Sequence, residues 1–185
     1  HTGEQSIAEF LATVGARAGL DVDLQPALPG RPNLIARLTP RGTLKQRILL
    51  APHLDTVPAA DGQYAPTAKL GRLHGRGACD TKGSVAAMYS AMCELAHGDR
   101  RPSGTEIIFA GLADEEHCQA GSRALVASGF KAALAIVCRR WSWNAPNLFP
   151  CSTMSMRWKR MSGRMKLLES DHIHSMLSKY WFSSS

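Results

Sequence analysis

The chain has no apolar run close to the ~20 residues that a membrane-spanning helix needs, so we expect no membrane partner. It also lacks a basic segment followed by an apolar one at its start, the pattern of a signal peptide. Its five cysteines are odd in number and show no C-x-x-C spacing, which predicts neither a disulfide framework nor a zinc ribbon. A reducing, cytoplasmic location is therefore expected.

What the chain does have is the composition of a folded domain. It contains 185 residues, of which 44% are hydrophobic and 20% are charged, close to the average for globular proteins. These values exclude disordered and collagen-like classes. A chain of this length has room for one ordinary domain with a sizeable core, and not for two.

The positive charge is concentrated at one end of the chain. The net charge of +7 would suggest a nucleic-acid partner. However, residues 1–138 carry 14 basic and 13 acidic side chains, whereas residues 139–185 carry 8 and 2. This tail also holds all four tryptophans and contains no recognisable nucleic-acid-binding module. We therefore expect no nucleic-acid partner, and we predict a boundary between residues 1–137 and an irregular basic tail, 138–185.

Hydrophobic periodicity predicts alternating strands and helices before this boundary. The predicted helices cover residues 3–19, 81–96 and 120–128, and the predicted strands cover residues 33–38, 47–51, 105–112 and 132–137. This alternation favours an α/β fold, a three-layer α/β/α arrangement with a largely parallel (mixed) sheet. In such sheets, ligands bind outside the carboxyl ends of the strands, and polar residues follow two of the predicted strands directly.

The first polar motif is His53-Leu54-Asp55, after the strand at 47–51. Side chains two apart on extended backbone point the same way, so the two residues should be neighbours. A metal-bound imidazole usually donates its other ring N–H to a carboxylate, which makes His53 a candidate ligand and Asp55 its support. Alone, the motif is also compatible with an ordinary polar contact.

The second motif is the glycine-bounded turn Gly75–Gly83, which delivers Asp80 to a helix start where an N-cap carboxylate belongs. A phosphate-binding loop is excluded, because Lys82-Gly83-Ser84 inverts the order that such a loop requires. A plain helix cap is the simpler interpretation of Asp80 when the motif is considered alone.

The third motif is Asp114-Glu115-Glu116, directly after an apolar strand. Clustered carboxylates repel one another unless cations or hydrogen bonds neutralise them, although a solvated acidic turn is the simpler interpretation. On an extended segment, Glu115 and Glu116 would point opposite ways, so Glu116 could face a metal while Glu115 faces a water molecule as general base. The other histidines are predicted to be surface or structural residues: His74, His97, His117, His172 and His174.

Together, residues 50–58, 75–83 and 113–116 resemble the zinc peptidase family of acetylornithine deacetylase, succinyl-diaminopimelate desuccinylase, aminoacylase and glutamate carboxypeptidase. The similarity extends over roughly residues 3–137. It implies that residues 1–137 form an incomplete catalytic domain of a zinc exopeptidase. It also implies a hydrolase that cleaves the amide bonds of small N-acyl amino acids or peptides.

The resemblance assigns a role to each candidate residue. It implies two divalent metal ions, zinc first and cobalt as the alternative. His53 would bind one ion, Asp80 would bridge both and Glu116 would bind the second. Glu115 would be the general base, and Asp55 would orient His53.

The chain departs from the family after Val137. Where the family reads approximately Gly-Glu-Pro-Thr and supplies a further metal ligand, this chain reads Cys138-Arg139-Arg140-Trp141. The family's dimerisation domain and its second metal-binding histidine have no counterpart in 185 residues. We therefore expect weak metal binding and no homodimer.

Composition and resemblance change at the same residue, so our hypothesis is a frameshift or truncation near Val137. Sequencing the locus tests it, because a Gly-Glu-Pro-Thr stretch should then be encoded in another frame. The alternative function is that of a non-catalytic relic or interaction module, which keeps the fold and binds metal weakly at most.

Overall fold

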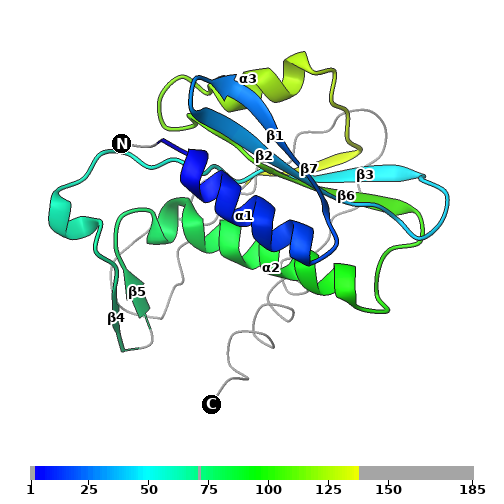
Figure 1. Ribbon diagram of the computed structural model, residues 1–185, viewed down its shortest axis with the longest axis horizontal. Helices are drawn as coiled ribbons and strands as arrows, with labels where there is room; N and C mark the ends of the chain where they lie inside the picture. The colour runs from blue at the N-terminus through cyan, green and yellow to red at the C-terminus, as the bar shows by residue number, and fades with distance from the viewer. Residues whose placement is uncertain (1–2, 71, 138–185) are drawn as a thin grey trace.

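The protein contains a sheet with helices on both faces (Figure 1). The computed structural model describes residues 3–70 and 72–137. Helices α1 (Gln5–Arg17) and α2 (Gly83–His97) cover one face of the sheet, and α3 (Ala120–Ala127) covers the other. The expected three-layer α/β arrangement is confirmed. The predicted irregular tail lies outside the described residues.

The main sheet has five strands and is mixed. In spatial order they are β1 (Asp21–Leu28), β2 (Arg31–Leu38), β6 (Thr105–Gly111), β3 (Gln46–Leu50) and β7 (Leu134–Ile136). Strand β3 pairs in parallel with β6 and β7, whereas the β1–β2 and β2–β6 pairings are antiparallel. The strands predicted at 33–38 and 47–51 are consecutive in sequence, yet β6 lies between them in the sheet.

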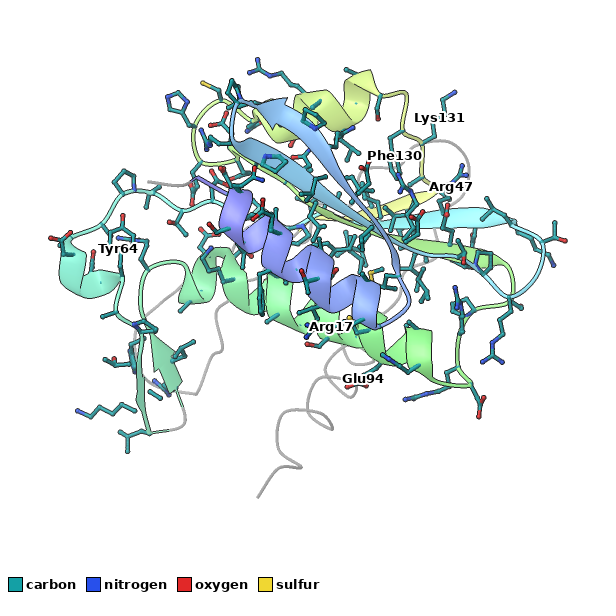
Figure 2. All side chains as sticks on the ribbon, in the orientation of Figure 1. Arg17, Arg47, Tyr64, Glu94, Phe130 and Lys131 are labelled. Atoms are coloured by element: carbon teal, nitrogen blue, oxygen red, sulfur yellow. The ribbon has the colours of Figure 1, made fainter. Side chains whose placement is uncertain are left out.

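Three strands were not predicted from the sequence. Strand β1 is an edge strand in which exposed and half-buried residues alternate, so it has no apolar run. Strands β4 (Thr67–Lys69) and β5 (Arg72–His74) form an exposed antiparallel hairpin that projects from the body of the molecule (Figure 1). Tyr64, next to the short helix η1 (Asp61–Gln63), also lies out on this projection (Figure 2).

Each face of the sheet has its own apolar core. Between the sheet and α1 and α2, the rings of Tyr89 and Phe109 meet edge to face with centroids 4.8 Å apart. On the α3 side, Ile108 and Leu125 are buried and Phe130 packs against them (Figure 2). Burying an aliphatic or aromatic side chain contributes about 1.5–3 kcal/mol, so these two layers stabilise the sheet and the strand ends that carry the polar motifs.

The parallel pairing of β3 with β6 continues past the ends of both strands. The backbone N–H of Leu54 donates to the carbonyl of Leu112 at 2.8 Å, and the N–H of Leu112 donates to the carbonyl of Pro52 at 2.9 Å. These hydrogen bonds place His53 beside the segment that follows β6. No helix among the described residues has the length and apolar character needed to cross a bilayer.

Candidate metal centre

His53 has an acidic partner on each side of its ring. The residue is only 3% exposed. Its Nδ1 lies 3.2 Å from Oδ1 of Asp55 and 3.1 Å from the Asp55 carbonyl oxygen, and its Nε2 lies 3.1 Å from Oδ1 of Asp80. If Nδ1 carries the proton toward Asp55, Nε2 is left with a free lone pair for a cation. The expected closeness of His53 and Asp55 is therefore present.

Asp80 reaches the site from a turn, and the prediction that it caps α2 is wrong. The helix begins at Gly83, and the residue at its N-cap position is Lys82. Asp80 has extended backbone angles, φ −120° and ψ 93°, within the turn η2 (Ala78–Lys82), and the Asp80–Thr81 peptide bond is cis. Its carboxylate thus faces His53 instead of the free N–H groups of the helix.

Glycine is required at the start of this turn. Gly77 has φ +79°, a left-handed conformation that side chains rarely adopt. A Cβ atom at this position would also lie 2.6 Å from Cγ2 of Thr56. The motif's second glycine is therefore explained by the close approach of the turn to the segment after His53.

Glu115 and Glu116 lie in a turn after β6, as the simpler interpretation of the motif predicts, and not on an extended segment. One ligand atom from each of them and one ring nitrogen of His53 all lie within 4.8 Å of one another. The two glutamates therefore converge instead of pointing in opposite directions. The reason is Asp114, whose φ of +62° redirects the chain immediately before them.

The pKa values reflect this concentration of negative charge. Burial alone would lower the pKa of His53, but hydrogen bonds with Asp55 and Asp80 and the charge of Glu115 raise it to about 9. The pKa of Glu116 is raised, first by burial and then by the neighbouring carboxylates. The pKa of Asp55 is lowered, because hydrogen bonds from His53 and from the backbone outweigh the opposite effect of burial.

These residues fit a divalent metal ion. Asp80, Glu115 and Glu116 surround one imidazole, and nitrogen with carboxylate oxygen is a donor set that zinc accepts. Two ligands of one tetrahedral zinc lie about 3.3 Å apart, and the ligand atoms of His53, Glu115 and Glu116 lie within 4.8 Å of one another. A divalent cation would also relieve the repulsion among the carboxylates.

A second group of possible donor atoms, Asp114, His117 and Cys118, adjoins the first. Asp114 is 1% exposed and its carboxylate already accepts hydrogen bonds from Arg31 and from the N–H groups of Cys118 and Ala120. His117 is exposed, as expected for a surface residue. The group therefore offers two adjacent exposed side chains, His117 and Cys118, and the carboxylate of Asp114, which already accepts three hydrogen bonds.

Sequence reasoning missed two residues close to this centre, Glu4 and Arg31. They bind each other and the turn that carries Glu115 and Glu116. The only signal was the stretch Gly30-Arg31-Pro32-Asn33, which formed part of the resemblance without an assigned role. Of the other predicted surface histidines, His74 and His97 are exposed, and His172 and His174 lie outside the described residues.

Known proteins resemble the chain in sequence and in fold. Residues 49–159 match Peptidase family M20/M25/M40. The chain is 37% identical over 117 residues to a succinyl-diaminopimelate desuccinylase from Methylobacterium radiotolerans, which covers 60% of this chain and 29% of the relative. It is 32% identical over 126 residues to an acetylornithine deacetylase from Vibrio vulnificus, which covers 65% and 32%.

Solved structures agree on the fold. A tripeptidase from Staphylococcus aureus superposes with a TM-score of 0.63 at 24% identity, covering 77% of this chain and 39% of that one. The chain spans about a third of the length of the curated relatives it matches.

The family match includes every predicted site residue, from His53 to Glu116, and extends beyond the described residues to position 159. It covers more than half of the 185 residues. The matched range contains the three motifs whose acidic residues lie near His53 in the structure. By this match, the chain belongs to peptidase family M20/M25/M40.

Proposed function

We propose that this chain forms the metal-binding part of a hydrolase that cleaves amide bonds in N-acyl amino acids or small peptides. The observation that carries the proposal is the arrangement around the buried imidazole of His53. Its Nε2 lies 3.1 Å from Oδ1 of Asp80, and ligand atoms of Glu115, Glu116 and His53 lie within 4.8 Å of one another. The names of the relatives, a desuccinylase and a deacetylase, support an acyl group on an amino acid as the substrate class.

The proposed roles follow the contacts. His53 would hold one ion, while Asp55 accepts a hydrogen bond from Nδ1–H and holds the ring in place. Asp80, whose Oδ1 lies 3.1 Å from Nε2 of His53, would be shared by the two ions. Glu116 would hold the second ion. The proposed ions are two divalent cations, zinc first and cobalt as the alternative.

Glu115 is the proposed general base. Bound divalent ions at this centre would supply Lewis acidity, which lowers the pKa of a water molecule and polarises the scissile carbonyl. Glu115 would accept a proton from the attacking water and pass it to the leaving nitrogen. Asp55, lying behind His53, takes no part in this proton transfer.

The expectation of weak binding belongs to the proposal. The matched motifs supply His53 and Asp80 to one ion, and Asp80 and Glu116 to the other, whereas catalytic zinc usually has three protein ligands. The sequence after Val137 does not contain the family's next ligand motif. A chain that keeps the fold but has lost catalysis is therefore the second candidate, and the boundary at residue 137 stays a prediction.

Metal binding and hydrolysis together distinguish the two candidates. We expect the purified chain to take up Zn²⁺ or Co²⁺ in calorimetric titration and to hydrolyse N-acetyl or N-succinyl amino acids. In Glu115→Gln, metal uptake should persist while the rate falls at least 100-fold, because the proton acceptor is removed. A folded chain that binds no metal and shows no rate would support the relic.

Glu94→Gln is the matched control. Glu94 is an exposed glutamate on α2, and it lies away from the centre (Figure 2). The control makes the same chemical change, so its rate and metal uptake should equal those of the unchanged chain. An equal loss of rate in both variants would remove Glu115 from the proposed role.

The remaining parts of the proposal concern location and assembly. Within the described residues, Cys79, Cys93 and Cys118 form no disulfide, which is compatible with a reducing cytoplasm. We propose a small-molecule substrate as the partner, with neither nucleic acid nor membrane. Homodimerisation is not part of the proposal.

A further inference from the structure

A partly buried ion network connects the start of α1 to the turn that carries Glu115 and Glu116. Nε and Nη2 of Arg31 donate to the two carboxylate oxygens of Glu4 at 2.6 and 2.7 Å. Nη1 of the same guanidinium donates to Oδ1 of Asp114 at 2.9 Å. Glu4 is 2% exposed and Asp114 is 1% exposed. Two buried carboxylates thus share one cation.

The turn after β6 is wrapped around the Asp114 side chain. Oδ2 of Asp114 accepts hydrogen bonds from the backbone N–H groups of Cys118 and Ala120, both at 3.2 Å. Its own N–H donates to Oε1 of Glu4 at 2.9 Å. These contacts, with the salt bridge to Arg31, hold Asp114 at its φ of +62°, a conformation that few residues other than glycine, asparagine and aspartate adopt.

The orientation of Asp114 decides where the next two residues point. Glu115 and Glu116 follow it directly, and ligand sites tolerate displacements of only about 0.5 Å. A rotation at Asp114 would therefore move both carboxylates away from His53. Glu4 and Arg31 have no atoms in the group of potential ligands, yet they determine the conformation of the residue on which that group depends.

Arginine is needed at position 31 for geometric reasons. Its three donor nitrogens form a planar fork that spans both oxygens of Glu4 and one oxygen of Asp114. Lysine keeps the charge but is a point donor, so it cannot hold both carboxylates in this arrangement. A substitution of Arg31 by lysine therefore removes the orientation of the two carboxylates while the net charge stays the same.

We propose that Glu4 and Arg31 are positioning residues of the metal centre, which act through Asp114 to orient the proposed ligand Glu116 and the proposed general base Glu115 beside His53. This inference rests on the proposed function, because it assumes that the centre holds metal and that Glu116 is one of its ligands. Simple stabilisation of the fold would explain the burial of Glu4 and Asp114 beside the partly exposed Arg31, but buried ion pairs are weak evidence for stability. Glu4 also accepts a hydrogen bond from the backbone N–H of Asp114, at the start of the turn that carries Glu115 and Glu116.

The test measures Co²⁺ binding by the full chain and its Arg31→Lys variant. Affinity comes from calorimetric titration, and the absorption of bound Co²⁺ reports the ligand geometry. We expect Arg31→Lys to remain folded by circular dichroism, to bind Co²⁺ at least tenfold more weakly and to show an altered visible spectrum. Loss of thermal stability with unchanged affinity and spectrum would overturn the proposal.

Arg47→Lys is the matched control. Nε of Arg47 lies 2.6 Å from Oε2 of Glu106, in an arginine–glutamate pair at the amino ends of β3 and β6, away from the centre (Figure 2). This variant should leave Co²⁺ affinity and spectrum unchanged. If it weakens binding as much as Arg31→Lys does, the effect is general and the proposal fails.

A second variant covers the case in which Arg31→Lys does not fold. Glu4→Gln keeps the shape of the side chain and one acceptor oxygen, and it should weaken Co²⁺ binding and alter the spectrum in the same direction. A folded Glu4→Gln chain with unchanged affinity and spectrum would overturn the proposal.

The outcomes also separate this inference from the proposed function. Co²⁺ binding by the unchanged chain without hydrolysis would reject the proposed activity, while a weakened Arg31→Lys variant would still support positioning. A chain that hydrolyses substrate and is insensitive to Arg31→Lys would reject positioning alone. A chain that takes up no Co²⁺ would reject both.

Discussion

The backbone N–H of Glu116 donates a hydrogen bond to Oδ2 of Asp55, 3.0 Å away. The other oxygen of this carboxylate lies 3.2 Å from Nδ1 of His53. One side chain therefore contacts both the histidine after β3 and the acidic turn after β6. The expected role of Asp55 was to orient His53, and its contact with Glu116 shows that it also holds the second segment.

We predict that Asp55→Asn weakens zinc binding about 10- to 100-fold, the usual effect of losing a partner of a metal-bound histidine. The neutral amide cannot raise the basicity of His53, and only one of its two polar atoms can accept a hydrogen bond. Calorimetric titration with Zn²⁺ measures the effect. Asp61→Asn, an exposed aspartate in η1, is the control and should bind normally. Equal affinities in the two variants would contradict the prediction.

We predict that the metal-free chain loses stability as the pH rises from about 6.5 to 9. The pKa of His53 is raised to about 9 in the folded chain, above the 6.5 of a free histidine, so its protonated form stabilises the fold. That contribution is complete below pH 6.5 and is lost as the pH passes 9, amounting to roughly 3 kcal/mol.

Urea unfolding of the metal-free chain at pH 6, 7.5 and 9 measures this loss. His53→Gln should show a flatter dependence on pH, because the titrating group is gone. A stability that rises over this interval in the unchanged chain would refute the assignment of the raised pKa.

Helices α1 and α2 meet at Gly15, and we predict that Gly15→Ala destabilises the fold by about 1–3 kcal/mol. A Cβ at this position would collide with the hydroxyl of Tyr89, which donates a hydrogen bond to the Leu11 carbonyl at 2.7 Å. The urea midpoint should fall accordingly. Gly62→Ala is the control, because no atom lies within 4 Å of its added Cβ. Similar midpoints for both variants would disprove the close contact.

Gly121→Ala should weaken both the fold and the metal centre. An added Cβ would lie 2.5 Å from the carbonyl oxygen of Ala113 and 2.6 Å from its nitrogen, so the backbone directly before Asp114 must move. We expect a loss of about 1–3 kcal/mol in unfolding free energy, together with weaker Co²⁺ binding. A variant that is less stable but binds Co²⁺ normally would show that the acidic turn tolerates this movement.

The elements that could be predicted from the sequence are those with strong apolar patterns. In helix α2 the buried residues recur at helical spacing. Strand β6 contains a continuous apolar run. Strand β1 could not be predicted, because its residues are polar or half-buried and it gains its hydrogen bonds only by pairing with β2. The position of β6 between β2 and β3 could not be predicted either, since strand order depends on contacts between segments that are distant in the sequence.

The candidate site shows the same division. His53, Asp80 and Glu116 could be named because each stands in a recognisable motif. Glu4 could not, because a glutamate before a helix is usually solvated, and only the fold brings Arg31 to it. The convergence of Glu115 with Glu116 was also missed, since it follows from the left-handed backbone of Asp114.

The sequence by itself determined which chemical groups are available, one imidazole and several carboxylates, and which local elements carry them, because residue type and periodicity are properties of short segments. Only the tertiary structure decided how these groups face one another and what holds them there. The physical reason is that the turns at Asp80 and Asp114 are oriented by hydrogen bonds and salt bridges to residues far away in the chain.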